Sequence, residues 1–370
     1  MRFDWVVVGA GFTGATFARA AADRGRRVLV VESRLHLGGN SYDEQDERGV
    51  LVHAYGPHIF HTNDGRVWSF LSAFTEWRPY MHRVLALIDG SWAPLPFNLN
   101  SIERLLPRKL ADDLASKLVA TFGYGARVPI LELRETDDAQ LRFLADYVYQ
   151  RVFLSYTRKQ WGVAPDQLDP QVTARVPVLV SRDDRYFQDT HQAMPARGYA
   201  PLFRRMLDHP NIQVLLGARH SDVLGEVPSA RVLFTGPIDA FFGHRLGVLP
   251  YRSIRFEFRG ANVDRYQEVA VHNYPETEAF TRITECKQLS GQVIPGLTTL
   301  CTEYPQDHVH GVTEAYYPVP RAESRELYAR YAALAKAEAP GVVFAGRLGE
   351  FQYLNMDQAV ARGLALAEAA

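Results

Sequence analysis

Hydrophobic positions change period twice near the N-terminus of the chain. Residues 5–8 form a short apolar run, which predicts a strand. The next segment, GAGFTGATFARAAADRG, predicts a tight turn and a helix whose alanines allow close packing and which stops near Gly25. RRVLVVES then returns to an apolar run. We predict a strand, a helix and a second strand in succession, the start of a βαβ unit.

The pattern changes again after residue 75. Residues 76–97 contain short apolar stretches separated by turns, and Asp89-Gly90 is a hairpin signal. From 98 to 165 apolar residues recur at three- and four-residue spacing, as in SIERLLPRKLADDLASKLVATFG. This stretch is predicted to form a small helical domain.

Strand-like segments return in the second half of the chain. Those at 211–217, 231–235 and 341–346 are expected to join the N-terminal strands in one sheet, whereas 250–304 holds several segments typical of an antiparallel sheet. We therefore predict an α/β fold with a discontinuous Rossmann-like nucleotide-binding domain and two insertions. The predicted domains are the nucleotide-binding domain at 1–75, 196–242 and 340–370, the helical domain at 98–165, and the antiparallel sheet domain, which would bind substrate, at 76–97, 166–195 and 243–339.

Composition excludes several classes of protein. The 370 residues carry a formal net charge of -1, so no overall charge favours nucleic acid or an anionic membrane as partner. The two cysteines, Cys286 and Cys301, do not form a disulfide framework or a CxxC motif. No apolar run approaches the ~18–20 residues of a membrane span. The chain opens directly into a predicted strand, so we expect no signal peptide. We expect a cytoplasmic protein.

The first turn carries a dinucleotide-binding motif. Gly9, Gly11 and Gly14 form GxGxxG between a predicted strand and a helix, and Glu32 ends the next strand. The glycines permit a tight turn, close approach of backbone N–H groups to a pyrophosphate, and helix–strand packing. The carboxylate of Glu32 can accept hydrogen bonds from a ribose diol. The alternative is a packed glycine turn without ligand.

Three later segments favour FAD over NAD as the dinucleotide. RLHLGGN at 34–40, VLFTGP at 232–237 and GVVFAGR at 341–347 resemble the signatures of FAD enzymes of the glutathione-reductase type, although Asn40 stands where many members have Arg. Gly39, Asn40 and Arg347 then become candidate FAD contacts; Arg347 would pair with the pyrophosphate or form a surface ion pair. A helix that starts near Met356, Asp357 and Gln358 could aim its N-terminus at the flavin pyrimidine edge and stabilise the anionic reduced form.

An ordered set of short segments resembles the UDP-galactopyranose mutase family from Val6 to about Leu366. The segments are YGPHIFHTN (55–63), LPFNLN (95–100), YTRKQWG (156–162), RVPV (175–178), YFQDTHQAMPARGY (186–199), TGPID (235–239), YRSIRFE (251–257), TRITE (281–285), EAYYPV (314–319) and GRLGEFQYLNMDQ (346–358). Each segment alone is weak evidence, but the complete set in this order is specific.

The resemblance assigns roles to residues of the substrate site. Arg175 and Arg282 would neutralise the sugar-nucleotide diphosphate, and Tyr156 would stack on uracil. His58 and His61 would lie against flavin and sugar, with His61 the active-site member; a metal reading of this HxxH lacks a third ligand. The remaining implied substrate contacts are Trp161, Tyr186, Asn273, Tyr317, Tyr353 and Asn355. Tyr316 adjoins Tyr317, and Asn355 stands where other members can have Asp.

The resemblance implies an isomerase that interconverts UDP-galactopyranose and UDP-galactofuranose for cell-surface polysaccharide biosynthesis. N5 of reduced FAD would attack the anomeric carbon as a covalent nucleophile, with no net redox change. FAD would have to be kept reduced, for example by NAD(P)H, and we expect a homo-oligomer. Two other functions remain open: a flavoprotein oxidase or dehydrogenase of the same fold, and a non-catalytic binder like the GDP-dissociation inhibitors.

Overall fold

The computed structural model describes residues 2–163, 177–227 and 231–370. Its contacts divide the chain into two compact units. Unit 1 comprises residues 1–80, 189–251 and 315–370, and unit 2 comprises 81–188 and 252–314. Both the stretch predicted to be helical and most of the second sheet lie in unit 2, while the division into three domains stays a prediction.

Unit 1 is built on a five-stranded parallel sheet in the order β12-β2-β1-β13-β19. Its central strands are apolar along their length because both faces of a parallel sheet are covered; Val6, Val7, Val28 and Val30 are fully buried. The predicted strands that return late in the sequence do join β1 and β2, which confirms the discontinuous Rossmann-like sheet. The bounds are β1 (Trp5–Val8), β2 (Val28–Glu32), β12 (Ile212–Leu216), β13 (Arg231–Phe234) and β19 (Val342–Phe344).

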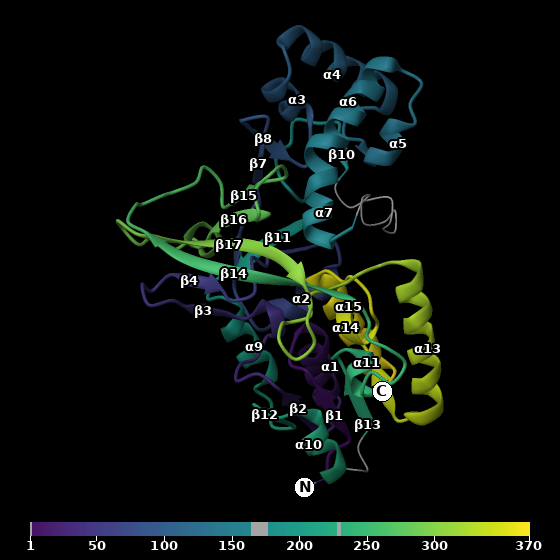
Figure 1. The fold of residues 1–370 in the computed structure, drawn as a ribbon. Coiled ribbons are helices and arrows are strands. Elements are labelled where there is room, and N and C mark those ends of the chain that lie inside the picture. Colours follow the sequence, from purple (N-terminus) through teal and green to yellow (C-terminus); the bar gives the residue numbers. More distant parts are fainter. Residues whose placement is uncertain (1, 164–176, 228–230) are drawn as a thin grey trace. The chain divides into compact units, whose positions relative to one another are not determined.

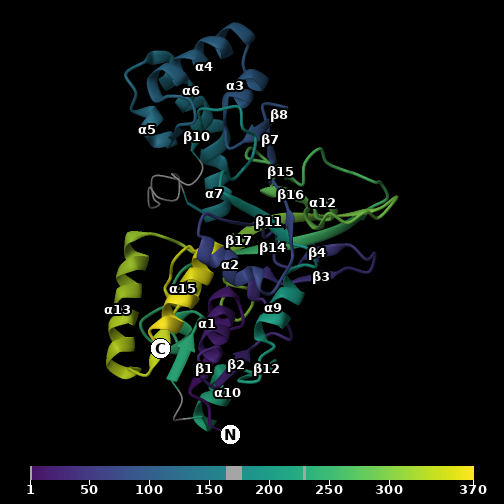
Figure 2. The same ribbon diagram turned by 180° about the vertical axis from the view of Figure 1, so that it is seen from behind.

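The C-terminal helix of unit 1 packs directly on its first helix. Helix α1 (Phe12–Ala22) and helix α15 (Met356–Glu368) lie side by side in Figures 1 and 2. A side chain at Gly363 of α15 would place its Cβ 2.7 Å from the carbonyl oxygen of Thr13. The small residues of both helices therefore allow an approach that brings the last segment of the chain beside the first turn.

Smaller elements of unit 1 surround this helix pair. A three-stranded sheet has the order β5-β11-β6, and a hairpin pairs β3 with β4. Their bounds are β3 (Asp43–Gln45), β4 (Leu51–His53), β5 (Phe60–Thr62), β6 (Trp77–Pro79) and β11 (His191–Pro195). The other elements are the 3-10 turn η1 (Gly39–Ser41), α2 (Gly65–Ser72), α9 (Tyr199–Leu207), α10 (His220–Val223), η4 (Leu224–Glu226), α11 (Ile238–Phe241), β18 (Tyr317–Pro318), α13 (Ala322–Glu338) and α14 (Gly346–Gly349).

Unit 2 contains a sheet with the strand run β14-β17-β16-β15-β7-β8. All of these pairs are antiparallel except β15 with β7, so the wholly antiparallel sheet of the prediction is corrected at this pair. Residues 89–270 separate the two strands along the chain, so no tight turn forces them to run in opposite directions. The predicted hairpin is confirmed, because Asp89 and Gly90 link β7 and β8 with positive φ angles of 47° and 77°. The bounds are β7 (Val84–Ile88), β8 (Ser91–Leu95), β14 (Tyr251–Ala261), β15 (Val271–Asn273), β16 (Arg282–Glu285) and β17 (Thr298–Asp307).

Four helices of unit 2, α3, α4, α5 and α6, gather in one cluster (Figure 1). Fully buried Leu114, Leu118, Ile130 and Leu144 fill its core, as the spacing of apolar residues predicts. The last predicted helix is interrupted by a π-helical stretch between α6 and α7. The bounds are α3 (Leu99–Leu105), α4 (Arg108–Phe122), β9 (Arg127–Val128), α5 (Ile130–Arg134), α6 (Ala139–Val148), the π-helical η2 (Tyr149–Leu154), α7 (Ser155–Trp161), β10 (Val178–Leu179) and α12 (Cys286–Ser290).

Candidate functional site

The turn between β1 and α1 accepts only glycine at two of its positions. A Cβ at Gly14 would lie 2.0 Å from the carbonyl oxygen of Gly9, and a Cβ at Gly9, whose φ is +99°, would lie 2.1 Å from Thr235 Oγ1. Gly11 is the N-cap of α1 and offers no side chain to the helix end. Gly39 approaches it from η1, since a Cβ there would lie 3.1 Å from the Gly11 Cα. The turn has the bare backbone that a pyrophosphate site requires.

Glu32 is buried and connects this turn to the loop after β2. Its Oε2 accepts a hydrogen bond from the Ala10 N–H at 2.9 Å, and its Oε1 accepts one from the Arg34 N–H at 2.9 Å. The Arg34 side chain reaches forward to Asn40, where Nη2 donates to Oδ1 at 3.0 Å. Its guanidinium also lies over the Tyr55 ring, 4.4 Å from the centroid. Arg34, which the motif search did not single out, thus brings an arginine to the position where Asn40 departs from the usual signature.

The N-terminus of α15 is tied to both η1 and β5. Ser41 Oγ donates to Met356 Sδ at 3.8 Å, and Thr62 Oγ1 donates to Asp357 Oδ2 at 3.1 Å. Asn355 is the N-cap residue, and its N–H donates to Gln358 Oε1 at 2.9 Å. The N-termini of α1 and α15 therefore both lie beside η1, an arrangement that fits an extended, anionic dinucleotide.

The two histidines of the HxxH segment have different partners. His58 Nδ1 hydrogen bonds with the Gly56 carbonyl at 2.8 Å, and the His58 N–H donates to His53 Nδ1 at 3.0 Å. His61 Nδ1 lies 2.8 Å from Asp189 Oδ2. Burial lowers the pKa of His53 to about 3, so its ring is neutral and available as an acceptor. Within the described ranges, no three His, Cys, Asp or Glu side chains form a group that could hold a metal ion.

Arg347 lies against the tyrosine pair that the sequence left unresolved. Its two Nη atoms donate to the carbonyls of Tyr316 and Leu354, at 3.3 and 3.2 Å. Tyr316 is buried, whereas Tyr317 stacks on Tyr353 with ring centroids 5.3 Å apart and planes 7° apart. The guanidinium lies 5.4 and 5.7 Å from these two ring centroids. Of the pair, Tyr317 is the one that shares a cluster with Arg347 and Tyr353.

In unit 2 the pairing of three strands aligns Asn273, Arg282 and Glu303 in a row. Arg282 is directly opposite Asn273 of β15 on one side and Glu303 of β17 on the other. Directly opposed residues face the same side of a sheet. Arg282 Nε donates to Glu303 Oε1 at 2.5 Å, and Glu303 is only 1% exposed. Asn273 is buried too, and among the described residues its Oδ1 has no hydrogen-bond partner. The buried carboxylate fixes one edge of the guanidinium beside an amide acceptor.

Helix α7 carries half-buried Tyr156 and buried Trp161 and is held at its C-terminus by side chains from distant segments. Arg252 donates from Nε to the Gln160 carbonyl at 2.9 Å and from Nη2 to the Lys159 carbonyl at 3.1 Å. Lys159 in turn donates from Nζ to the carbonyls of three residues between 274 and 280. Burial lowers the pKa of both Arg252 and Lys159.

A further residue predicted for the substrate site, Tyr186, packs against His82 in unit 2. Tyr186 makes an edge-to-face contact with His82, with ring centroids 5.7 Å apart, and its N–H donates to the His82 carbonyl at 2.7 Å. Arg175 lies outside the described residues.

Sequence reasoning missed the residues that orient the site side chains. No sequence pattern assigned a role to Asp189, Arg252, Lys159 or Glu303. The first three do stand inside the family-like segments YFQDTHQAMPARGY, YRSIRFE and YTRKQWG, which was the available signal.

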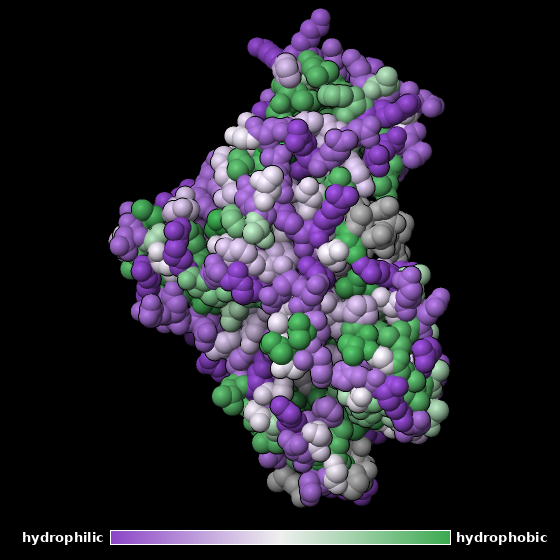
Figure 3. All heavy atoms as spheres, viewed as in Figure 1, coloured by the Kyte–Doolittle hydropathy of each residue, from purple (hydrophilic) through white to green (hydrophobic). Residues whose placement is uncertain are grey.

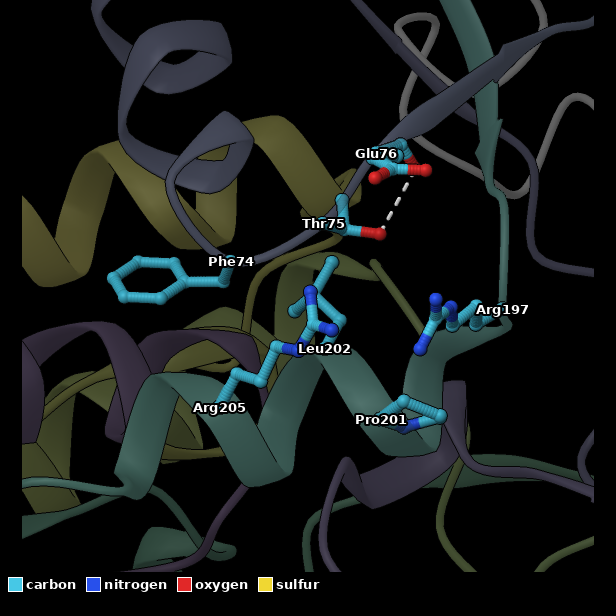
Figure 4. A pocket seen from close by; sticks show the side chains of 7 residues that line it. All are labelled: Phe74, Thr75, Glu76, Arg197, Pro201, Leu202 and Arg205. Carbon is cyan, nitrogen blue, oxygen red and sulfur yellow. Dashed lines mark hydrogen bonds between the residues drawn. The ribbon is translucent and has the colours of Figure 1, made fainter.

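Two hollows of unit 1 are lined by residues outside the candidate site. The pocket of Figure 4 has a volume of about 10 Å³, room for a single water. The guanidinium groups of Arg197 and Arg205 border it, beside the hydroxyl of Thr75. A larger hollow of about 230 Å³ borders α13 and is lined by mostly apolar residues with Lys336. Apolar side chains also gather over α13 in Figure 3.

Comparison with known families places the chain. A family model described as UDP-galactopyranose mutase matches residues 151–353, and a model of NAD(P)-binding Rossmann-like domains matches 7–74. A probable UDP-galactopyranose mutase of Klebsiella pneumoniae is 36% identical over 98% of this chain and 93% of its own length. The chain belongs to the UDP-galactopyranose mutase family.

Other relatives show the range of that family. The UDP-galactopyranose mutase of Mycoplasma pneumoniae is 35% identical over 99% of this chain and 96% of its own. A dTDP-fucopyranose mutase of Escherichia coli is 34% identical over 98% and 97%. The fold matches the crystal structure of a reduced UDP-galactopyranose mutase with a TM-score of 0.75 at 16% identity, covering 100% of this chain and 93% of that one. UDP-galactopyranose mutases thus resemble this chain along its whole length. In the part of the chain that the structure describes, no helix is both long and apolar enough to cross a bilayer.

Proposed function

We propose that the chain is a UDP-galactopyranose mutase that interconverts UDP-galactopyranose and UDP-galactofuranose with bound, reduced FAD. Family membership over the whole chain supports the reaction class. The observation that carries the proposal is the row of Asn273, Arg282 and Glu303. In this row a buried carboxylate orients an arginine beside a buried amide oxygen that has no hydrogen-bond partner in the part of the chain that the structure describes. Such a row suits a ligand that combines anionic phosphates with hydroxyl donors.

Contraction of a six-membered sugar ring requires the diphosphate to leave the anomeric carbon and later to return. Reduced FAD, when bound, would supply its N5 as the nucleophile at that carbon, with no net redox change. Arg282 and Arg175 neutralise the charge that develops on the leaving diphosphate. Tyr317 and Tyr353 are the proposed hydrogen-bond donors to phosphate oxygens, and Asn273 is a proposed contact of the nucleotide or sugar.

The groups of unit 1 hold the cofactor in this proposal. The N-terminus of α1 faces the pyrophosphate, and Glu32 accepts from the adenosine ribose. The N-terminus of α15 stabilises negative charge on the reduced ring. An NAD(P)H-type reductant, a homo-oligomeric assembly and a cytoplasmic location belong to the same proposal.

The test is turnover of UDP-galactofuranose by the purified protein, with and without dithionite, followed by anion-exchange separation of the products. We expect UDP-galactopyranose only, or far faster, under reduction. Retention of FAD and binding of UDP without any conversion would contradict the mutase. Oxidation of the sugar without added reductant would favour the hypothesis of a flavoprotein oxidase or dehydrogenase instead.

The relative that is a dTDP-fucopyranose mutase supplies a second candidate substrate. The same assay with dTDP-fucopyranose gives kcat/KM for each sugar nucleotide. We expect the uridine nucleotide to be preferred, and a higher kcat/KM for the thymidine nucleotide would reassign the substrate.

Arg282→Ala tests the role of the row itself. Loss of one stabilising cation typically costs about 10²–10³ in rate. We therefore expect kcat to fall by about that factor while the protein retains its flavin, as measured by the flavin absorbance per chain. A near-normal rate in this variant would show that Arg282 does not take part in the reaction.

A further inference from the structure

His61 belongs to a small cluster of hydrogen-bonded polar side chains on one face of β5. His61 is directly opposite Gln192 of β11, so both side chains lie on one face of this sheet. Asn63 follows two residues after His61, and Asp189 precedes β11 by two residues. We refer to His61, Asn63, Asp189 and Gln192 as the β5–β11 cluster. All four belong to unit 1.

Backbone partners fix the orientation of both amides in the cluster. The Thr190 N–H donates to Asn63 Oδ1 at 2.8 Å, so the Nδ2 of Asn63 must be the atom that meets Asp189 Oδ1 at 2.6 Å. The Asp189 carbonyl accepts from Gln192 Nε2 at 2.9 Å, which likewise assigns the two ends of the Gln192 amide. These bonds leave no freedom to exchange oxygen and nitrogen in either side chain.

The same bonds determine where His61 carries its proton. One carboxylate oxygen of Asp189 accepts from Asn63, and the other lies 2.8 Å from His61 Nδ1. A carboxylate oxygen can only accept here, so Nδ1 is the donor. In the neutral imidazole Nε2 then has the lone pair and acts as an acceptor or base.

A second acceptor on this face points to a ligand. Gln192 is 4% exposed, and its Oε1 has no hydrogen-bond partner among the described residues. A buried oxygen without a hydrogen-bond donor is unfavourable, and a donor on a bound molecule would satisfy it. The strand β5 is also tied to the N-terminus of α15 through Thr62 and Asp357, so the cluster adjoins the proposed cofactor site.

We propose that Asp189 is a positioning residue that holds His61 as the Nδ1–H tautomer and so presents Nε2 as an acceptor to a donor group of the bound sugar or flavin. This inference rests on the proposed function for the identity of the ligand, but the tautomer itself does not. Asn63 contributes to this positioning, because its Nδ2 donates to one oxygen of Asp189 and leaves the other oxygen for His61.

Asp189→Asn is expected to exchange donor and acceptor in the hydrogen bond between residue 189 and His61 Nδ1. Asn63 still requires an acceptor, so the new amide turns its oxygen to Asn63 and its NH₂ to His61 Nδ1. Nδ1 can then only accept, and the neutral ring is forced into the Nε2–H form. In the double variant Asn63→Ala/Asp189→Asn the amide is free to rotate and to accept from Nδ1 again.

The first measurement is a long-range ¹H–¹⁵N spectrum of the holoenzyme labelled with ¹⁵N-histidine, in which His61 is assigned by its absence from His61→Gln. We expect Nδ1 protonated in the wild type, Nε2 protonated in Asp189→Asn, and a return to Nδ1 in the double variant. An Nε2–H tautomer in the wild type, or an unchanged tautomer in Asp189→Asn, overturns the proposal.

Kinetics and flavin binding then locate the donor. We expect kcat to fall about 10–100-fold in Asp189→Asn, with KM within about threefold, and to recover in part in the double variant. If the donor belongs to the flavin, FAD affinity and the reduced flavin spectrum change as well; if it belongs to the sugar, they do not. Equal kcat in Asp189→Asn and wild type overturns the role.

The matched control is Asp23→Asn. Asp23 is another carboxylate of unit 1 that faces a histidine, His209, at 3.6 Å, but on the far end of α1. Its kcat should equal that of the wild type. Failure of the wild type to turn over any sugar nucleotide would defeat the proposed function, whereas the tautomer measurement would still decide the inference.

Discussion

The turn between β1 and α1 in unit 1 and helix α7 in unit 2 both present candidate ligand groups, but they are built differently. In the turn, the requirement for glycine at Gly14 comes from a contact within a short stretch of chain, with the Gly9 carbonyl oxygen. Helix α7 depends on Arg252, which donates to carbonyls 92 and 93 residues earlier in the chain. Steric exclusion defines the first region, and long-range hydrogen bonds to a helix end define the second.

This difference predicts different failures. A side chain in the glycine turn collides with backbone atoms that cannot move away, so the cofactor site and the fold should be lost together. Loss of the Arg252 hydrogen bonds to the end of α7 leaves the backbone intact but loosens the helix that carries Tyr156 and Trp161. Gly14→Ala and Arg252→Ala test this contrast, and two further substitutions with smaller expected effects concern other parts of unit 1.

Gly14→Ala should abolish FAD binding and lower the free energy of unfolding by about 3 kcal/mol or more, because its Cβ would lie 2.0 Å from the Gly9 carbonyl oxygen. Flavin absorbance per chain and urea unfolding measure the two effects. Gly65→Ala is the control, since a Cβ at Gly65 has no neighbour within 4 Å. Retention of FAD by Gly14→Ala would contradict the steric account.

Arg252→Ala should weaken UDP binding about tenfold and leave the FAD content unchanged, because the Lys159 and Gln160 carbonyls at the end of α7 lose their donors. Isothermal titration of the holoenzyme with UDP measures the affinity. Arg252→Lys, which keeps a cation without the planar fork, should lie between the two.

Asp307→Asn is the control for the Arg252 substitutions. Asp307 pairs with Arg252 but its side chain is 90% exposed, so an affinity close to that of the wild type is expected. If Arg252→Ala loses FAD together with UDP affinity, the two regions are not independent.

His53→Asn should remove part of the acid sensitivity of the protein. Burial lowers the pKa of His53 from 6.5 to about 3, so between these values the unfolded chain binds a proton that the folded protein does not. Stability is therefore lost as the pH falls below 6.5, by up to about 1.4 kcal/mol per pH unit from this group. Urea unfolding at several pH values should show a shallower slope in His53→Asn, whose amide oxygen can still accept from the His58 N–H.

His209→Asn provides the comparison, because His209 Nδ1 also accepts a backbone N–H, that of Asn211, at 3.1 Å. The change of slope in His53→Asn is compared with that in His209→Asn. A slope in His53→Asn equal to that of the wild type would mean that burial of His53 does not set the acid response.

Asp64→Ala should cost about 1 kcal/mol of unfolding free energy without any effect on FAD or UDP. Asp64 is the N-cap of α2, and its Oδ1 accepts from the N–H groups of Arg66 and Val67 at 2.8 and 3.2 Å. Asp64→Asn keeps an acceptor and should be nearly neutral. Equal unfolding curves for the two variants would contradict the capping role.

The accuracy of the sequence predictions follows the same contrast. The strands of the parallel sheet, the glycine turn and the Asp89-Gly90 hairpin were predicted because each has a local pattern that one conformation satisfies. The parallel pairing of β15 with β7 was not, since neither strand carries a signal for the direction of its neighbour. The choice between Tyr316 and Tyr317 also required the fold, because adjacent tyrosines are equivalent in composition and differ only in burial.

The sequence by itself determined the nucleotide-binding architecture and the family, because glycine spacing, apolar periodicity and the order of the short segments are properties of the chain. Only the tertiary structure decided which groups orient the candidate site. Asp189 meets His61 across 128 positions, and Glu303 meets Arg282 across 21, through strand registers that no local pattern encodes. A hydrogen bond between distant segments depends on the packing of everything between them, and that packing exists only in the folded protein.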